Sequence, residues 1–132
     1  MKTFNVEAIK SVDGVAFGTT RKEVRAHFGD DYREIKKSKL SKNTMDVYSS
    51  CHVFYTPEDV LEAVEIFPES KVVVNGQSIP TEYDAAVKWL KDMASDVEVD
   101  GDGATSAELG ISLYAPNGRI ESIMTADEKY FA

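Results

Sequence analysis

The sequence predicts an α+β protein in which a largely antiparallel sheet of about six to eight strands carries two short helices on one face. Helical spacing of apolar residues is confined to two segments, 21–28 and one that follows Pro80. The rest of the chain consists of short Val-, Ile- and Tyr-rich runs between polar turns, which is typical of strands. Asn75-Gly76 and Asn117-Gly118 each lie between two such runs, and this dipeptide favours the two-residue turn of a hairpin.

The first helix has a clear start and a clear end. Thr20 and Glu23 form a capping box, in which the two side chains satisfy backbone N–H groups of the first turn. Val24 and Phe28 then share one face of the helix. Gly29 follows as a C-terminal stop, so this helix should be short.

The second helix should open after Pro80, with the segment 81–84 as a weaker cap, and run to about Ser95. Its apolar residues recur at spacings of three and four, which predicts one buried face. These residues are Tyr83, Ala86, Val87, Leu90 and Ala94.

The strands are assigned from the remaining apolar runs and the turn residues that bound them. The runs 45–55, 60–67 and 71–74 should form three successive antiparallel strands, and each Asn-Gly dipeptide should close one further hairpin. The expected strands are 4–9, 32–35, 45–55, 60–67, 71–74, 77–79, 110–114 and 119–124, with a polar loop over 38–44.

The length fits a single domain, 1–132, and a weak internal repeat lies within it. Residues 55–64 align without a gap on residues 114–123, and both follow the pattern Tyr-x-Pro-x-x-x-aliphatic-Glu-x-aliphatic. An expected helix and strand precede each copy. The sequence therefore predicts a degenerate tandem repeat of a helix-plus-hairpin unit, with halves 1–68 and 69–132, and a chance match is the alternative.

Charge is distributed unevenly along the chain. Residues 1–50 carry a net charge of +3, whereas residues 51–132 carry −11, which gives the total of −8. An acidic module of this kind repels nucleic acid, whose binding depends on Lys and Arg. It would attract a basic protein surface, and the alternative is that the charge only keeps the protein soluble.

Several features indicate a cytoplasmic protein with no membrane contact. The one cysteine, Cys51, permits no internal disulfide, which fits a reducing compartment. The first ten residues contain Lys2 and Glu7 but no apolar run, so no secretory signal is expected. No stretch approaches the roughly 20 apolar residues that cross a bilayer.

The segment from Gly14 to Gly29 resembles a motif of the β-lactamase-inhibitor-protein-like domains. The shared pattern is Gly-x-x-x-Gly-x-[Ser/Thr]-x-x-Glu-Val-x-x-x-Phe-Gly. The resemblance implies a small helix-plus-antiparallel-sheet unit, sometimes present in tandem, that binds another protein. In general character the chain also resembles bacterial immunity proteins, which are small acidic cytosolic domains that neutralise a toxin.

Two segments could carry chemistry, and neither fits its pattern. The acidic run 96–102 resembles a calcium loop, but the twelfth position is Ala107 or Leu109, depending on the register, where a carboxylate is needed. Cys51 and His52 are neighbours on an expected strand and point to opposite faces, so Cys51 is interpreted as a buried structural thiol. We expect no catalytic residue, no metal site and no cofactor.

The sequence favours a non-enzymatic protein-binding module, most concretely a cytoplasmic inhibitor or immunity-type protein that masks a basic partner such as a toxin domain. The alternative is a small-ligand-binding domain or enzyme that uses the sheet face near Glu62 and Glu121, the equivalent glutamates of the repeat. The basic tract 33–42 is expected to be a solvated loop or a contact for an acidic region. The candidate partner-binding residues are Glu62, Glu121, Asp100, Asp102 and Tyr114.

Overall fold

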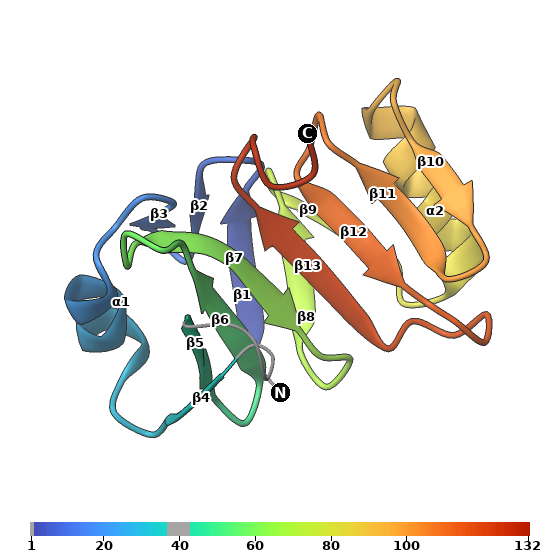
Figure 1. Ribbon diagram of the computed structural model, residues 1–132. Helices are drawn as coiled ribbons and strands as arrows, with labels where there is room; N and C mark the ends of the chain where they lie inside the picture. Colours follow the sequence, from blue (N-terminus) through green and yellow to red (C-terminus); the bar gives the residue numbers. More distant parts are fainter. Residues whose placement is uncertain (1, 37–42) are drawn as a thin grey trace.

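The computed structural model describes residues 2–36 and 43–132, and these residues form two helices and two sheets (Figure 1). The predicted α+β class is therefore confirmed. The expected single sheet is wrong, because the strands divide between a large sheet and a small one. No helix among the described residues is long and apolar enough to cross a membrane.

The large sheet is antiparallel at every strand pair. Its order is β10-β11-β12-β13-β7-β6-β5-β4, so that β7 and β13 meet in the middle. The segment 45–55, predicted as one strand, forms two strands joined by a turn. The strands are β4 (Arg33–Lys36), β5 (Thr44–Val47), β6 (Cys51–Tyr55), β7 (Leu61–Ile66), β10 (Glu98–Asp100), β11 (Gly103–Ser106), β12 (Ile111–Tyr114) and β13 (Ser122–Ala126).

The small sheet lies behind the large one in Figure 1 and has the order β3-β2-β1-β8-β9. Its central pair, β1 and β8, is parallel, and it joins segments almost seventy residues apart. The sequence predicted that the strand 71–74 continues the antiparallel series of 45–67. This prediction is wrong, because the strand belongs to the small sheet. The strands are β1 (Thr3–Glu7), β2 (Ser11–Val12), β3 (Val15–Ala16), β8 (Lys71–Val74) and β9 (Gln77–Ser78).

Helix α1 (Arg21–Phe28) has the predicted bounds, and the backbone N–H of Glu23 donates to the Thr20 hydroxyl as the capping box requires. Helix α2 (Tyr83–Met93) begins later and ends earlier than expected. Its N-cap is Glu82, whose side chain makes no capping hydrogen bond, so the cap predicted over 81–84 is wrong. Packing of its apolar face therefore supports α2 more than its cap does.

The two Asn-Gly dipeptides differ in outcome. Asn75 and Gly76 both have positive φ and close the β8–β9 hairpin in the predicted two-residue turn. Asn117 and Gly118 lie in a longer loop, because the pairing of β12 with β13 begins only at Tyr114 and Ser122. The strand pairing was predicted correctly and the turn was not. The loop expected over 38–44 lies mostly outside the described residues, and Thr44 begins β5.

The main core fills the space between the two sheets and receives one face of each helix. Residues from both chain halves contribute to it, including Phe4, Val24, Val64, Leu90 and Leu113, each at most 1% exposed. Both helices therefore cover the same face of the large sheet as the small sheet does. Within residues 2–36 and 43–132, no helix covers the opposite face of the large sheet.

The two chain halves have the same element order within the large sheet. Helix α1 precedes the meander β4-β5-β6-β7, and helix α2 precedes the meander β10-β11-β12-β13. The repeated motifs nevertheless pair differently: Phe54 is opposite Ala63, whereas the equivalent Leu113 is opposite Ile123, one position further on. Duplication of the sequence therefore stays a prediction.

Candidate functional site

The uncovered side of the large sheet, here called the open face, is the broadest candidate surface. Successive residues of a strand alternate between faces, so residues that are direct partners across neighbouring strands share a face. One unbroken row of such partners crosses all eight strands on the open face. From β4 to β10 it consists of Arg33, Val47, His52, Glu65, Met124, Ser112, Thr105 and Glu98.

Three of the candidate residues lie together at the β10–β12 end of this face. Asp100, Asp102 and Tyr114 line one shallow hollow of about 90 Å³. The Asp100 carboxylate accepts backbone N–H groups from Asp102, at 2.8 Å, and from Gly103, at 3.1 Å, and so fixes the β10–β11 turn. Tyr114, the last residue of β12, is 47% exposed and lies opposite Gly103 of β11. The structure thus brings the aromatic side chain of Tyr114 together with two of the candidate carboxylates.

Glu121 belongs to the same end of the sheet. Its backbone N–H donates to the Tyr114 carbonyl oxygen at 2.7 Å, and the residue is exposed just before β13 begins. Four exposed carboxylates therefore belong to this end of the sheet: those of Asp100 and Asp102, which share the hollow with Tyr114, and those of Glu98 on β10 and of Glu121 just before β13. We call this group the acidic corner.

Glu62 does not join the acidic corner. Its carbonyl oxygen accepts the N–H of Asp127 at the far end of β13, whereas Glu121 precedes the near end. At roughly 3.4 Å per residue along a strand, the two glutamates are about 20 Å apart. The structure therefore does not bring Glu62 and Glu121 into one acid–base pair, although they match in the sequence motif.

The centre of the open face holds a polar cluster that the sequence did not indicate. Glu65 lies 3.5 Å from Nδ1 of His52 and accepts the Ser122 hydroxyl at 2.8 Å. The His52 ring packs edge-on against Phe67, with centroids 4.8 Å apart. His52 was assigned to the face opposite Cys51, and this is confirmed, but its partner comes from the next strand and could not be identified without the register.

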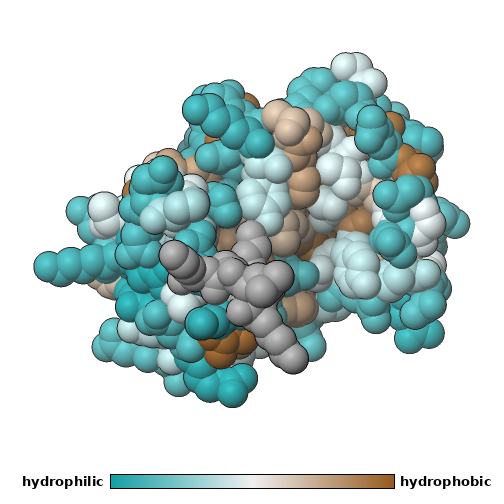
Figure 2. All heavy atoms as spheres, in the orientation of Figure 1, coloured by the Kyte–Doolittle hydropathy of each residue, from teal (hydrophilic) through white to brown (hydrophobic). Residues whose placement is uncertain are grey.

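The β4–β7 part of the open face is more apolar. Phe54, Ala63 and Ala126 form a second small core, and Tyr130 and Phe131 of the C-terminal segment pack against it. Figure 2 shows hydrophilic residues over most of this side of the molecule and hydrophobic residues gathered toward its middle. The open face is therefore charged at one end and partly apolar near its centre.

Cys51 lies on the core side of β6 and is 1% exposed. Burial raises the pKa of its thiol to about 11, so the reactive thiolate is scarce at neutral pH. Its interpretation as a structural thiol is confirmed.

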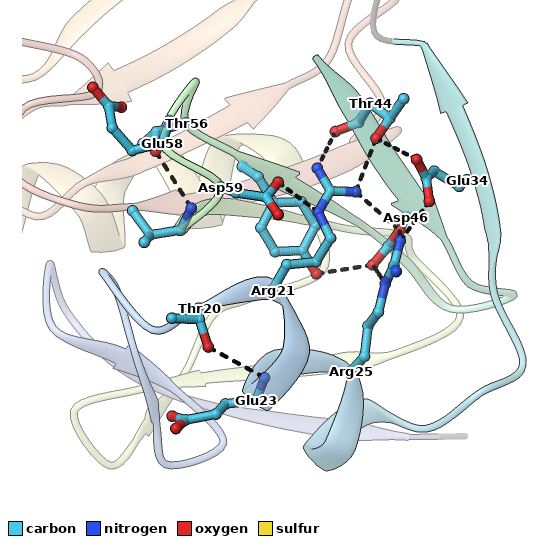
Figure 3. A network of polar contacts seen from close by, with 12 residues as sticks. Thr20, Arg21, Glu23, Arg25, Glu34, Thr44, Asp46, Thr56, Glu58 and Asp59 are labelled. Carbon is cyan, nitrogen blue, oxygen red and sulfur yellow. Dashed lines mark hydrogen bonds and ion pairs between the residues drawn. The ribbon is translucent and has the colours of Figure 1, made fainter.

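A buried network of ion pairs ties α1 to the edge of the large sheet (Figure 3). At its centre is Asp46 of β5, whose side chain is fully buried. Asp46 accepts two hydrogen bonds from Arg25, at 2.9 and 2.7 Å, and one from the Tyr55 hydroxyl at 2.9 Å. Arg21 approaches the same carboxylate to 3.6 Å and stacks over the Tyr55 ring. A bidentate pair of this kind is among the stronger polar contacts in proteins.

The two arginines extend the network outward. Arg21 donates to Asp59 at 2.7 Å and to the Thr44 hydroxyl at 2.8 Å, while Arg25 donates to Glu34 at 2.8 Å. The hydrogen bond from Arg25 keeps the pKa of Glu34 below its ordinary value. Since these guanidinium groups already have partners within the chain, the network is interpreted as a structural clamp.

The acidic run 96–102 does not form a loop of converging carboxylates. Asp96 accepts the Ser106 hydroxyl at 2.7 Å and the Glu108 N–H at 2.9 Å, and these bonds lower its pKa. The Asp100 carboxylate accepts hydrogen bonds from backbone N–H groups of its own turn. In the part of the chain that the structure describes, no three His, Cys, Asp or Glu side chains are grouped as metal ligands.

Comparison with protein-family models, with curated proteins and with solved structures finds no match for this chain. The open face and its acidic corner are therefore interpreted from their own geometry and charge.

Proposed function

We propose that the chain is a non-enzymatic protein-binding module whose open face, centred on the acidic corner, holds a basic partner protein. The observation that carries this proposal is that Asp100 and Asp102 share one hollow with the exposed Tyr114, on a sheet face that no helix of the described residues covers. Tyrosine combines a large apolar contact area with a polar hydroxyl and is frequent among the anchors of interfaces.

Charge on the strands supports a basic partner. The strands β5, β6, β7 and β10 to β13 contain no Lys or Arg, so nothing on these strands neutralises the acidic corner. Such a surface speeds the approach of a cationic protein and disfavours an anionic one. In its most concrete form the proposal is a cytoplasmic inhibitor or immunity-type protein whose partner is a toxin domain.

We also propose that the two halves are a degenerate tandem repeat. The equal order of one helix and a four-stranded meander in each half supports this, as does the motif shared by residues 55–64 and 114–123. The same arrangement is compatible with the resemblance of residues 14–29 to the β-lactamase-inhibitor-protein-like domains. The two copies differ at their tyrosines, since Tyr55 packs in the main core and is 1% exposed, whereas Tyr114 lies on the open face and is 47% exposed.

Site-specific photo-crosslinking tests where the partner binds. Tyr114 is replaced by benzoylphenylalanine, which keeps an aromatic side chain at an exposed position. The matched control carries the same group at Lys88, an exposed residue of α2 away from the open face. After irradiation in a lysate of the source cells, we expect a basic protein joined to the Tyr114 variant and absent from the control. Adducts that form equally at both positions, or an acidic protein at Tyr114, would contradict the proposal.

A further inference from the structure

A second hollow, separate from the open face, lies between the two sheets where they diverge. It has a volume of about 420 Å³ and is bounded by the β8–β9 hairpin on one side and by the start of β13 on the other. In Figure 1, β8 and β9 lie behind β13. A concave site of this size, at a junction between structural layers, is typical of a small-molecule pocket.

The walls of the hollow are aliphatic. Val72 of β8 and Ile79, which follows β9, are nearly buried, while Ile123 of β13 and Ile120, which precedes β13, are half-buried. No aromatic side chain is among the described residues that line it. Flexible aliphatic walls without a flat ring suit an alkyl chain better than a planar heterocycle.

The residues that line the hollow include the cationic side chain of Lys71. Lys71 is its only charged lining residue within the described part of the chain, and no described carboxylate lies within ion-pair distance of its ammonium group. Ser78 and Thr81, whose side chains end in hydroxyl groups, are also among the residues that line the hollow. An unpaired ammonium group beside hydroxyl donors can hold a carboxylate by charge-assisted hydrogen bonds.

We propose that this hollow binds a small monocarboxylate with an alkyl chain, the chain lying against Ile79, Ile120 and Ile123 and the carboxylate beside Lys71. Burying the chain supplies most of the affinity, because each methylene group removed from water adds to the hydrophobic stabilisation. The ammonium group supplies the preference for an anion. This site is independent of the partner-binding surface and goes beyond the proposed function.

Calorimetric titration with octanoate, below its micellar concentration, tests the site, and octylamine serves as the probe with the same chain and the opposite charge. We expect octanoate to bind with a stoichiometry of one and at least about tenfold more tightly than octylamine, the difference typical of a charge-assisted contact. Lys71→Gln should remove this preference. The Lys88→Gln control, on an exposed position of α2, should keep it.

A second pair of variants tests the apolar walls. Ile120→Trp fills the hollow from a half-exposed position and should abolish binding, whereas Ile35→Trp, on an exposed position of edge strand β4, should not. Circular dichroism checks that each variant is folded. If Ile120→Trp does not fold, the effect of Lys71→Gln on octanoate binding tests the proposal. Absence of octanoate binding, equal binding of octylamine, or binding unchanged by Lys71→Gln would overturn the proposal.

Discussion

Asp46→Ala is expected to lower the free energy of unfolding by about 3–5 kcal/mol, the loss typical when one partner of a buried ion pair is removed. The substitution would remove both acceptor oxygens that Asp46 offers to Arg25 and the acceptor of the Tyr55 hydroxyl, at a carboxylate that is fully buried. Since small domains are stable by only about 5–15 kcal/mol, this one change removes a large part of the total. Urea unfolding followed by circular dichroism measures it.

Asp59→Ala is the matched control for this substitution. Asp59 also receives a short hydrogen bond from Arg21, but its side chain is 60% exposed, so water can replace the contact. We expect a loss of about 1–2 kcal/mol, which comes mainly from placing alanine at the positive φ of 69° that Asp59 adopts and which is well below the loss for Asp46→Ala. Equal effects of the two substitutions would show that burial of Asp46 does not set its contribution, and would contradict the clamp.

Gly103→Ala is expected to lower the free energy of unfolding by about 3 kcal/mol or more, from backbone strain together with overpacking. Gly103 has a φ of 151°, which side-chain-bearing residues rarely adopt, and a Cβ there would overlap the carbonyl oxygen of Leu113 on β12. Because Gly103 stands opposite Tyr114, the substitution should also move β12 away from the acidic corner. Thermal unfolding measures the first effect, and the photo-crosslinking yield at Tyr114 measures the second.

Gly101→Ala provides the matched control in the same turn. A Cβ at Gly101 would meet no atom within 4 Å, so the change should stay within about 0.5 kcal/mol. A Gly103→Ala variant as stable as Gly101→Ala would show that β11 and β12 do not approach as closely as the structure has them.

Local signals in the sequence were sufficient for elements that depend on neighbouring residues. Thr20 and Glu23 located the start of α1, and Asn75-Gly76 located a hairpin, because both signals act through backbone groups a few residues away. Asp13-Gly14 has the same form between Val12 and Val15 and closes the β2–β3 hairpin with two positive φ values. Asp13-Gly14 is therefore a third local hairpin signal in the sequence, beside the two Asn-Gly dipeptides.

Long-range pairing could not be predicted in the same way. Nothing within β1 or β8 indicates that they pair in parallel, since the choice depends on how both halves close around the core. The Asp46 network has the same origin, because Arg21 and Arg25 lie on a helix and Asp46 on a strand that only the tertiary fold brings together. A basic helix face gives no sign of where its acidic partner lies.

The candidate site was predicted in part for a similar reason. Asp100, Asp102 and Tyr114 meet because β10, β11 and β12 are consecutive and antiparallel, which keeps turn residues near strand ends. Glu62 and Glu121 were grouped by motif equivalence alone. The antiparallel meeting of β7 and β13 places equivalent positions at opposite ends of the pair, so the motif could not predict proximity.

The most direct test of the claim that the acidic corner attracts a basic partner is an association rate. The partner identified by crosslinking is purified, and its rate of association with the chain is measured. Raising the ionic strength from about 0.01 M to about 1 M shortens the screening length from about 30 Å to about 3 Å, and should slow association at least about tenfold. The double variant Asp100→Lys and Asp102→Lys should associate slowly at low salt. The control is the double variant Asp30→Lys and Asp31→Lys, which changes the net charge equally on an exposed segment after α1 and should not slow association. A rate that is indifferent to salt, or equal slowing by the two double variants, would contradict the account.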